Sequence, residues 1–262
     1  QTDVASITRE LATLMNATGV CGCNMKVVVS IGGSVLAPDL DAPRVAAYAD
    51  VVRSLVDDGC QVAAVVGGGG IAREYIGAAR DLGANEIELD QLGIDVTRLN
   101  ARLLIAALGD DVANAPATDY EEAGEVLRNG DVCVMGGVTP AQTTDAVSAA
   151  VAEYVGADLL VYATSVPGVY SADPNEDDDA EQYPELSAAD LVDVIAGLEM
   201  NAGSSAPVDL LAAKIIQRAG TRTIVLDGTD PERVLDAVRY GEHEGTDVVP
   251  DGAGDQLTYW AE

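Results

Sequence analysis

Short, uninterrupted apolar segments recur along this chain, and a stretch with helical character follows most of them. Five such segments are predicted as strands, namely 25–31, 61–66, 131–135, 158–163 and 222–226. Strands that are apolar along their whole length, rather than at every second residue, are typical of a parallel sheet with both faces covered. We therefore predict an α/β fold with a mainly parallel central sheet and helices on both sides.

Helices are predicted between these strands. Asp41 and Pro43 supply the N-cap and the first-turn proline of one helix start. The other predicted helices span 71–82, 86–108, a segment from about 143, 188–195 and 208–218. Residues 164–184 are predicted to be irregular, and the acidic run 173–181 within them is expected to be a solvated surface loop.

The composition points to a folded core inside an unusually acidic surface. The chain has 44 acidic and 14 basic residues and a formal charge of −30, yet 48% of its 262 residues are hydrophobic. This apolar content favours a packed core over disorder. Lys26 and Lys214 are its only lysines, and an acidic, lysine-poor surface is typical of proteins that work at molar salt, as in a halophilic archaeon. Binding to a nucleic-acid polymer is disfavoured, because such binding depends on basic side chains.

The cysteines and the hydrophobic runs indicate in which cellular compartment the protein is expected. Cys21, Cys23, Cys60 and Cys133 do not have the spacing of a zinc site, so reduced thiols are expected. No apolar run approaches the ~18 residues of a membrane span, and the first residues do not resemble a signal peptide. We expect a soluble, cytoplasmic protein.

The chain is expected to contain one main domain, residues 25–250. Met25 is expected to be the natural start, which would make residues 1–24 an added extension; a helix for contacts between subunits is the alternative. Residues 251–262 are expected to form a C-terminal tail.

Three glycine-rich loops follow predicted strands: 32–34, 67–70 and 136–137. Ligands of open parallel sheets bind at the carboxyl ends of the strands, where these loops should meet. Glycine lets backbone amides approach an anion, and a helix N-terminus adds partial positive charge. The loops therefore predict a phosphate-binding site, built mainly from backbone because cations are scarce.

Other phosphate-related and hydrolytic sites fit less well. Gly67, Gly69 and Ala72 have the spacing of a dinucleotide fingerprint, but Glu88 and Asp90, at the distance of its acidic partner, do not look like a strand end. Neither lysine has the Gly-Lys-Ser/Thr setting of a P-loop. A Ser-His-Asp hydrolase is disfavoured, because the single histidine, His243, lies in a polar segment where we expect it to be solvated.

Phosphoryl transfer between two anionic substrates fits best. It requires positive groups around the moving phosphoryl group and little covalent chemistry from the protein. Arg73 lies near the start of its predicted helix, four residues after Gly69, where its guanidinium could bind a phosphate. Lys214 lies in an apolar helical segment, where we expect it among buried residues; it is either a catalytic cation or a lysine that extends its charge to solvent.

Five motifs resemble, in order and spacing, the amino acid kinase fold family, and within it the archaeal uridylate kinases. They are residues 31–36, 66–73, 90–94, 136–145 and 163–174. The Thr-Thr-Asp sequence of 143–145 and the Gly-Val-Tyr-x-x-Asp-Pro sequence of 168–174 are the most specific. The resemblance implies a three-layer αβα sandwich that transfers the γ-phosphoryl group of ATP to UMP with Mg²⁺, usually as a homohexamer.

The resemblance also implies residue roles, position by position. The N-terminal half would bind UMP and the C-terminal half ATP. Asp145 would orient Mg²⁺ or its loop, and it joins Arg73 and Lys214 as a candidate catalytic residue. The candidate ATP-binding residues are Gly33, Ser34, Gly69, Arg73, Thr164, Ser165, Tyr170 and Asp173. The candidate UMP-binding residues are Gly68, Asp90, Val138, Thr139, Pro140, Ala141, Gln142, Thr143 and Thr144. No protein ligand for a metal is certain, because Mg²⁺ would be held through the nucleotide phosphates.

Two features depart from the family pattern. Ser30 replaces a lysine that many members carry two residues before the first glycine, so Lys26, Lys214, Arg73 or the metal would have to supply that charge. Segment 164–168 has Ser and Pro where the family usually has Asn and Asp. Two alternatives remain: another kinase of this fold, acting on a carboxylate, a carbamate or an isoprenoid phosphate, and a non-catalytic relative that binds nucleotides or oxyanions.

Overall fold

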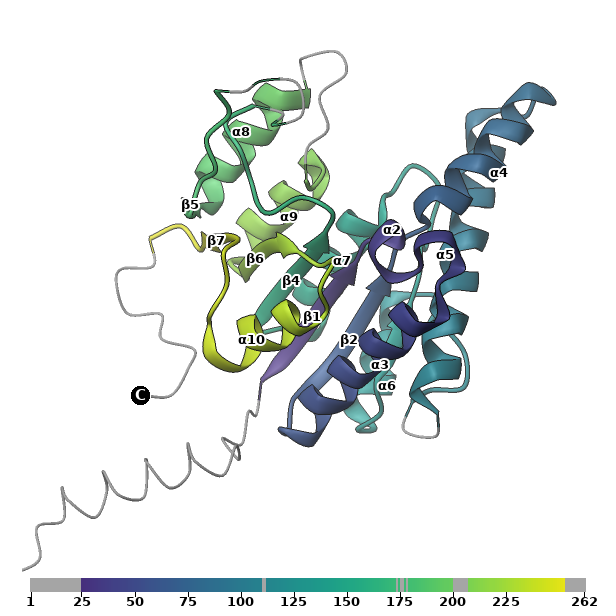
Figure 1. Ribbon diagram of the computed structural model, residues 1–262, viewed down its shortest axis with the longest axis horizontal. Helices are drawn as coiled ribbons and strands as arrows, with labels where there is room; N and C mark the ends of the chain where they lie inside the picture. Colours follow the sequence, from purple (N-terminus) through teal and green to yellow (C-terminus); the bar gives the residue numbers. More distant parts are fainter. Residues whose placement is uncertain are drawn as a thin grey trace, which may run out of the picture.

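The computed structural model describes residues 25–109, 112–172, 174, 177, 179–199 and 207–252. Residues 1–24 and 253–262, and with them the predicted extension and most of the predicted tail, lie outside the described residues. Within the described residues, one sheet of seven strands runs in the order β3–β2–β1–β4–β6–β7–β5 (Figure 1). The strands are β1 (Lys26–Ile31), β2 (Gln61–Val66), β3 (Cys133–Met135), β4 (Leu159–Thr164), β5 (Glu185–Ser187), β6 (Arg222–Asp227) and β7 (Thr246–Val249).

The sheet is mainly parallel, as predicted. The five predicted strands are present and pair in parallel, with β1 between β2 and β4. β7 is antiparallel to β6, and the edge strand β5 is parallel to β7. β5 and β7 were not predicted, because they contain only three and four residues and include polar side chains.

Helices cover both faces of the sheet, which confirms the three-layer sandwich. α3, α5 and α10 pack with one face, and α6 to α9 with the other (Figure 1). The helices are α2 (Gly33–Leu36), α3 (Ala42–Asp57), α4 (Gly69–Asp81), α5 (Glu86–Leu108), α6 (Tyr120–Arg128), α7 (Thr144–Val155), α8 (Ala188–Glu199), α9 (Leu210–Ala219) and α10 (Glu232–Tyr240), with a 3-10 turn at Pro38–Leu40. α6 and α10 were not predicted.

The apolar strands explain the two layers. In β1, Val27, Val29 and Ile31 belong to one hydrophobic core, and Val28 points to the other. Burying a side chain of this size contributes about 1.5–3 kcal/mol relative to its exposure. A strand with apolar residues in both directions therefore gains this stabilisation only between two helical layers.

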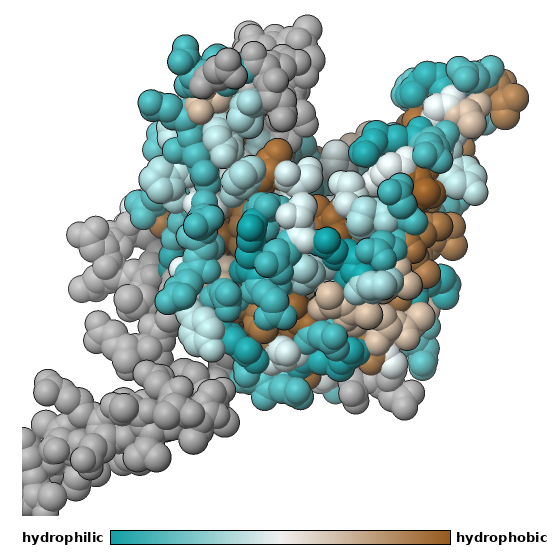
Figure 2. Space-filling model, in the orientation of Figure 1, coloured by the Kyte–Doolittle hydropathy of each residue, from teal (hydrophilic) through white to brown (hydrophobic). Residues whose placement is uncertain are grey.

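α4 projects from the sandwich as an arm together with the start of α5 (Figure 1). In α4 only Ala72 is buried. Figure 2 shows hydrophobic residues along this arm and the adjoining edge, whereas much of the remaining visible face is hydrophilic. The large hydrophobic residues exposed on α4, α5 and the turn between them are Tyr75, Leu82, Ile87, Leu99 and Leu103. No helix among the described residues has the length and apolarity required to cross a bilayer.

Candidate active site

The first two glycine loops are in direct contact at the carboxyl ends of β1 and β2. A Cβ atom on Gly33 would lie 2.2 Å from the amide nitrogen of Gly69 and 2.4 Å from the carbonyl oxygen of Gly67. These are backbone atoms, so no side chain can move aside to make room. Gly67 donates its amide to Ile31 at 2.9 Å. The predicted meeting of these loops is therefore confirmed, and it depends on the absence of a side chain at residue 33.

The start of α4 presents backbone donors next to this contact. Gly69 has φ +62°, a left-handed conformation that favours glycine, and its Cβ would lie 2.5 Å from the carbonyl carbon of Gly33. The first amides of a helix have no partner inside it. Arg73, one turn further along α4, is exposed and forms no ion pair with any described residue. Donors and a cation thus meet where the sequence predicted a phosphate.

The third glycine loop packs against α5. Gly137 donates its amide to Thr97 Oγ1 at 2.7 Å, and a Cβ on Gly136 would lie 2.4 Å from the same oxygen. The Gly137 amide is therefore already satisfied. Asn100 Nδ2 donates to the carbonyl of Gly67 at 2.9 Å. Polar side chains of α5, which the sequence analysis missed, thus connect the second and third loops.

Asp90 and residues 138–144 come together as the sequence predicted. Asp90 Oδ2 accepts the amide of Ala141 at 2.8 Å. Ala141 has φ +63°, an unfavourable conformation for a residue with a side chain. Gln142 Oε1 accepts from the hydroxyl of Tyr120 at 2.9 Å. Val138, Thr139 and Pro140 complete this segment, called the 138–144 loop below. Asp90 and Tyr120 stabilise its backbone course.

The end of the 138–144 loop is tied to α9. Thr143 is the N-cap of α7: its Oγ1 accepts the amide of Ala146 at 3.1 Å and donates to Asp209 Oδ2. Asp209 in turn caps α9 by accepting the amide of Ala212 at 2.8 Å. The Thr143 hydroxyl is thus occupied. Asp209 was missed by the sequence analysis, although an Asp directly before an apolar helical segment is a recognisable N-cap signal.

Asp145, in the first turn of α7, is a carboxyl group in an unfavourable setting. Burial, and then the nearby charge of Asp209, raise its pKa from 3.8 to about 7. Tyr162 donates its hydroxyl to the backbone oxygen of Asp145 at 2.8 Å. Ser30 is the register partner of Tyr162 on β1, so its buried side chain shares that face of the sheet. The lysine missing at residue 30 would have pointed to this side.

Both lysines lie in predicted elements, Lys26 in the first strand and Lys214 in the helix α9. Lys26 begins β1, at the edge of the sheet opposite the glycine loops, and its Nζ donates to the carbonyl of Val155 at 2.9 Å. It therefore cannot replace the charge missing at Ser30. Lys214 lies among buried residues, as expected: α9 buries Ala213 and Ile215 on either side of it. Lys214 itself is exposed, because residue 214 falls on the solvent side of the helical repeat, and this agrees with the alternative of a lysine that extends its charge to solvent.

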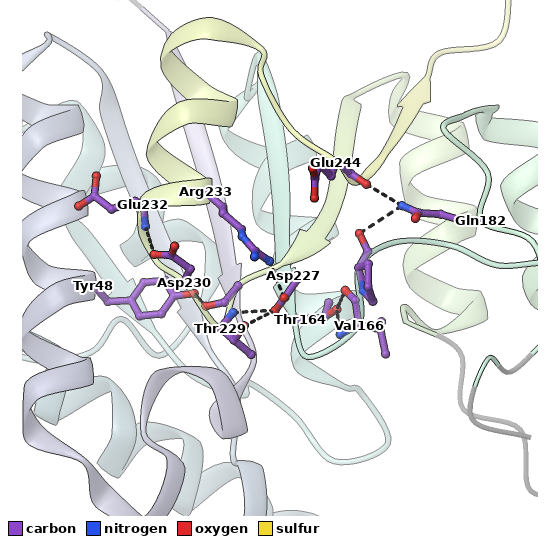
Figure 3. A network of polar contacts seen from close by, with 12 residues as sticks. Tyr48, Thr164, Val166, Gln182, Asp227, Thr229, Asp230, Glu232, Arg233 and Glu244 are labelled. Atoms are coloured by element: carbon purple, nitrogen blue, oxygen red, sulfur yellow. Dashed lines mark hydrogen bonds and ion pairs between the residues drawn. The ribbon is translucent and has the colours of Figure 1, made fainter.

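The loop after β4 carries the other half of the predicted site. Thr164 Oγ1 accepts the amide of Val166 at 3.1 Å (Figure 3). Tyr170 is half-buried and donates its hydroxyl to Gln182 at 3.3 Å. Ser165 is exposed. Asp173 lies outside the described residues.

A polar cluster follows β6, next to the loop after β4. Asp227 accepts from the amide and the hydroxyl of Thr229 at 2.9 and 2.6 Å and pairs with Arg233 at 2.5 Å (Figure 3). Burial opposes ionisation of Asp227, but these hydrogen bonds outweigh it and lower its pKa. Tyr48 of α3 donates to the carbonyl of Gly228 at 2.6 Å. This cluster was not predicted, because its members lie far apart in the sequence. Tyr48 and Gly228, for example, are separated by 180 positions.

Two further expectations concern acidic residues and the histidine. Glu88 and Asp90 both lie in α5 rather than at a strand end, which removes support from the dinucleotide interpretation.

His243 was expected to be solvated, but it is half-buried, and its Nδ1 is buried without a hydrogen-bond partner among the described residues. Burial lowers its pKa. It lines a shallow hollow together with Gln182 and Pro184.

Comparisons with known proteins agree with this geometry. Residues 25–227 match the sequence profile of the amino acid kinase family. The chain is 72% identical over 238 residues to uridylate kinase of Halobacterium salinarum, covering 91% of this chain and 99% of that protein. It is 71% identical over 227 residues to uridylate kinase of Haloarcula marismortui, covering 87% and 100%. The crystal structure of uridylate kinase from Archaeoglobus fulgidus superimposes with a TM-score of 0.78 at 45% identity, covering 86% of this chain and all of that one. Two glycine loops in contact at the carboxyl ends of a mainly parallel sheet thus occur in a chain that belongs to the amino acid kinase family.

Proposed function

We propose that the protein is a UMP kinase, which reversibly transfers the γ-phosphoryl group of ATP to UMP and gives UDP for pyrimidine nucleotide and CTP synthesis. The backbone contact between Gly33 and Gly67–Gly69 is the observation that carries this proposal. It brings the loop of β1 and the loop of β2 together, so two phosphorylated substrates bound on either side would have their phosphates adjacent. Such positioning supplies a large part of the rate in phosphoryl transfer.

The UMP side is formed by the second glycine loop and the 138–144 loop. Gly68 and the 138–144 loop would contact the nucleotide, and Asp90 would hold the ribose or fix the loop that does so. The hydroxyl of Thr144 and the first amides of α7 are suitable donors for a phosphate, since the Thr143 hydroxyl is already bonded.

The ATP side is formed by the loops after β1 and β4. Gly33, Ser34 and Gly69 would approach the transferred phosphoryl group. Arg73 would lie where the phosphates of ATP and UMP meet and would bind both. Thr164, Ser165, Tyr170 and Asp173 would line the pocket for the base and ribose. Lys214 stays a candidate cation only if its exposed side chain can extend back over α9 to the phosphates.

Asp145 and Asp209 are the carboxylates that fit a Mg²⁺ ion entering with ATP. No cluster of three or more potential ligands is present among the described residues, and Mg²⁺ is commonly held by one or two carboxylates together with substrate phosphates. When bound, the ion would neutralise charge that develops on the phosphoryl oxygens. Such a cation would favour the ionised form of Asp145, whose pKa is raised to about 7 by burial and by the charge of Asp209.

A homohexamer in the cytoplasm is part of this proposal. The exposed hydrophobic residues of the α4–α5 arm, such as Tyr75, Leu82 and Ile87, support assembly, because an apolar patch on an otherwise acidic surface is a feature of protein interfaces (Figure 2). Light scattering in concentrated KCl measures the mass of the assembly.

The activity test compares acceptors at high KCl. The purified protein with Mg²⁺ and ATP is offered UMP, CMP, N-acetylglutamate or isopentenyl phosphate, and the phosphorylated products are separated and quantified. We expect UMP to be the best acceptor. A better acceptor among the other three would replace the proposal with another kinase of this fold, and ATP binding without transfer would indicate a non-catalytic relative.

Arg73→Ala tests the cation at the start of α4. We expect a KM for UMP raised by roughly ten- to a hundredfold, because a charge-assisted bond to phosphate is lost. The matched control is Arg80→Ala, since Arg80 is exposed on the same helix and pairs with Glu86 at 3.2 Å. Equal kinetics for the two variants would remove Arg73 from the site.

A further inference from the structure

Arg98 is a guanidinium held beside the 138–144 loop. It lies in α5, is half-buried, and donates from Nε to the carbonyl of Gly137 at 3.2 Å. The residue before it, Thr97, contacts both substrate-side loops: its Oγ1 bonds to Gly137, and its Cγ2 lies 3.5 Å from where a Gly68 Cβ would be. Arg98 is therefore the sequence neighbour of the residue that contacts both the second and the third glycine loops.

The charge of Arg98 is not matched by a carboxylate. Within the described part of the chain, six arginines form ion pairs within 4.0 Å, and Arg98 is not among them. This is unexpected in a chain with 44 acidic residues. A guanidinium has five N–H donors, and Nε uses one. The two terminal nitrogens of Arg98 donate to no described residue, so the fork that recognises oxyanions is open.

The same helix defines one wall of the predicted UMP site. Asp90 binds the amide of Ala141 at 2.8 Å, and Ile94 lies 3.0 Å from where a Gly137 Cβ would be. Residues 90, 94, 97 and 98 are spaced so that they share one side of α5. Arg98 is the positively charged residue among these four. It lies at the part of α5 that contacts the second and third glycine loops, which follow β2 and β3.

We propose that Arg98 binds the phosphate of the acceptor nucleotide, as a second guanidinium in addition to Arg73. This inference rests on the proposed function, because it takes UMP as the acceptor. Its Nε bond to Gly137 would fix the plane of the guanidinium, leaving the terminal nitrogens to approach two phosphate oxygens together. In a protein with a net charge of −30, a dianionic substrate requires such local cations.

The test uses Arg98→Met with Arg102→Met as the matched control. Arg102 lies one turn further along α5, is exposed, and forms no hydrogen bond or ion pair with described residues. The full-length variants are assayed at one fixed KCl concentration for the KM of UMP, the KM of ATP and the inhibition constant of uridine, which lacks the phosphate. Arg98→Met should raise the KM of UMP by roughly ten- to a hundredfold and leave the other two constants within about twofold. Arg102→Met should match the unmodified protein.

Arg98→Lys distinguishes recognition from folding. It keeps the charge without the planar fork, so we expect a KM for UMP between those of the unmodified protein and Arg98→Met. If Arg98→Met leaves the KM of UMP unchanged, or weakens uridine and UMP equally, the phosphate assignment is overturned. If the unmodified protein does not phosphorylate UMP, the proposed function fails; calorimetric binding of UMP to the Arg98 and Arg102 variants then still decides whether Arg98 holds the phosphate.

Discussion

Asp145 is the residue at which the electrostatics of this site are least favourable. Its carboxyl group is close to Asp209, and residue 30, where many family members carry a lysine, is a serine. Lys26 does not compensate, since it begins β1, at the opposite end of the strand, and its Nζ donates to Val155. The side chain of Lys214 is exposed. Asp145 lowers the stability of the fold, yet it lies in the first turn of α7, whose amides are expected to donate hydrogen bonds to a phosphate. This combination is typical of a functional site rather than of a structural one.

Asp145→Asn should stabilise the protein while it reduces turnover. The pKa of Asp145 is raised from 3.8 to about 7, so the folded chain binds more protons than the unfolded chain between these pH values. Its contribution to stability is complete below pH 3.8 and is lost as the pH rises through about 7. The asparagine variant avoids this loss, and its Tm at pH 8 should exceed that of the unmodified protein by about 5 °C. Thermal unfolding at pH 5 and pH 8, in the same KCl, measures the difference.

The control for this prediction is Asp193→Asn, which removes an exposed carboxylate from α8. It should change Tm little at either pH. A Tm gain of Asp145→Asn that is equal at both pH values would show that removal of negative charge, and not the raised pKa, is responsible. A loss of Tm together with turnover would assign Asp145 a structural role.

At the scale of elements, the site depends on how closely the first two glycine loops approach. Gly33→Ala would place a methyl group 2.2 Å from the amide nitrogen of Gly69, so the β1 loop and α4 must separate. We expect the free energy of unfolding to fall by about 1–3 kcal/mol, as for other overpacked sites. The rate of UDP formation should fall even under conditions where the variant is fully folded, because the phosphates of the two substrates would no longer align.

Gly77→Ala is the control for the loop contact. Gly77 lies inside α4, and nothing lies within 4 Å of a Cβ placed there. Alanine favours a helix by about 1 kcal/mol over glycine, so this variant should be as stable as the unmodified protein or more so. Denaturant unfolding and the rate of UDP formation are measured for both variants. Normal activity of Gly33→Ala would show that the loop contact is not needed for transfer.

The parts of the fold that could be predicted are those with strong local signals. β1, β2 and β4 are apolar throughout, and α5 begins at an Asn85–Glu88 capping box, so their boundaries were close to those observed. β5 and β7 pair with each other across more than fifty residues and are short, so no local pattern identifies them. The same holds for the site: Asp90 and Arg73 lie in recognisable motifs. Arg98 and Asp209 matter only through contacts with residues 39 and 66 positions away.

At the scale of the whole molecule, repulsion between surface carboxylates opposes folding. With 44 acidic and 14 basic residues, at least thirty acidic groups cannot have a basic partner of their own. Of the ion pairs in the described structure, Arg222–Asp247 is the most buried, with 9% and 14% of its side chains exposed, and Arg239–Asp58 follows with 31% and 13%. Exposed pairs contribute about 0–1 kcal/mol each. Surface ion pairs therefore cannot offset the net charge, and the two hydrophobic cores must do so.

Stability should rise steeply with salt and then level off. The screening length falls from about 10 Å at 0.1 M salt to about 3 Å at 1 M, so most of the repulsion is removed below about 1 M KCl. We expect Tm to increase over this range and to change little between about 1 and 3 M. The experiment follows thermal unfolding across a KCl series, with sucrose at constant low salt as a control for stabilisation by exclusion from the surface. A Tm that kept rising linearly to 3 M would mean that salt acts on apolar burial. A Tm independent of salt would mean that the net charge of −30 has little influence on the folded state.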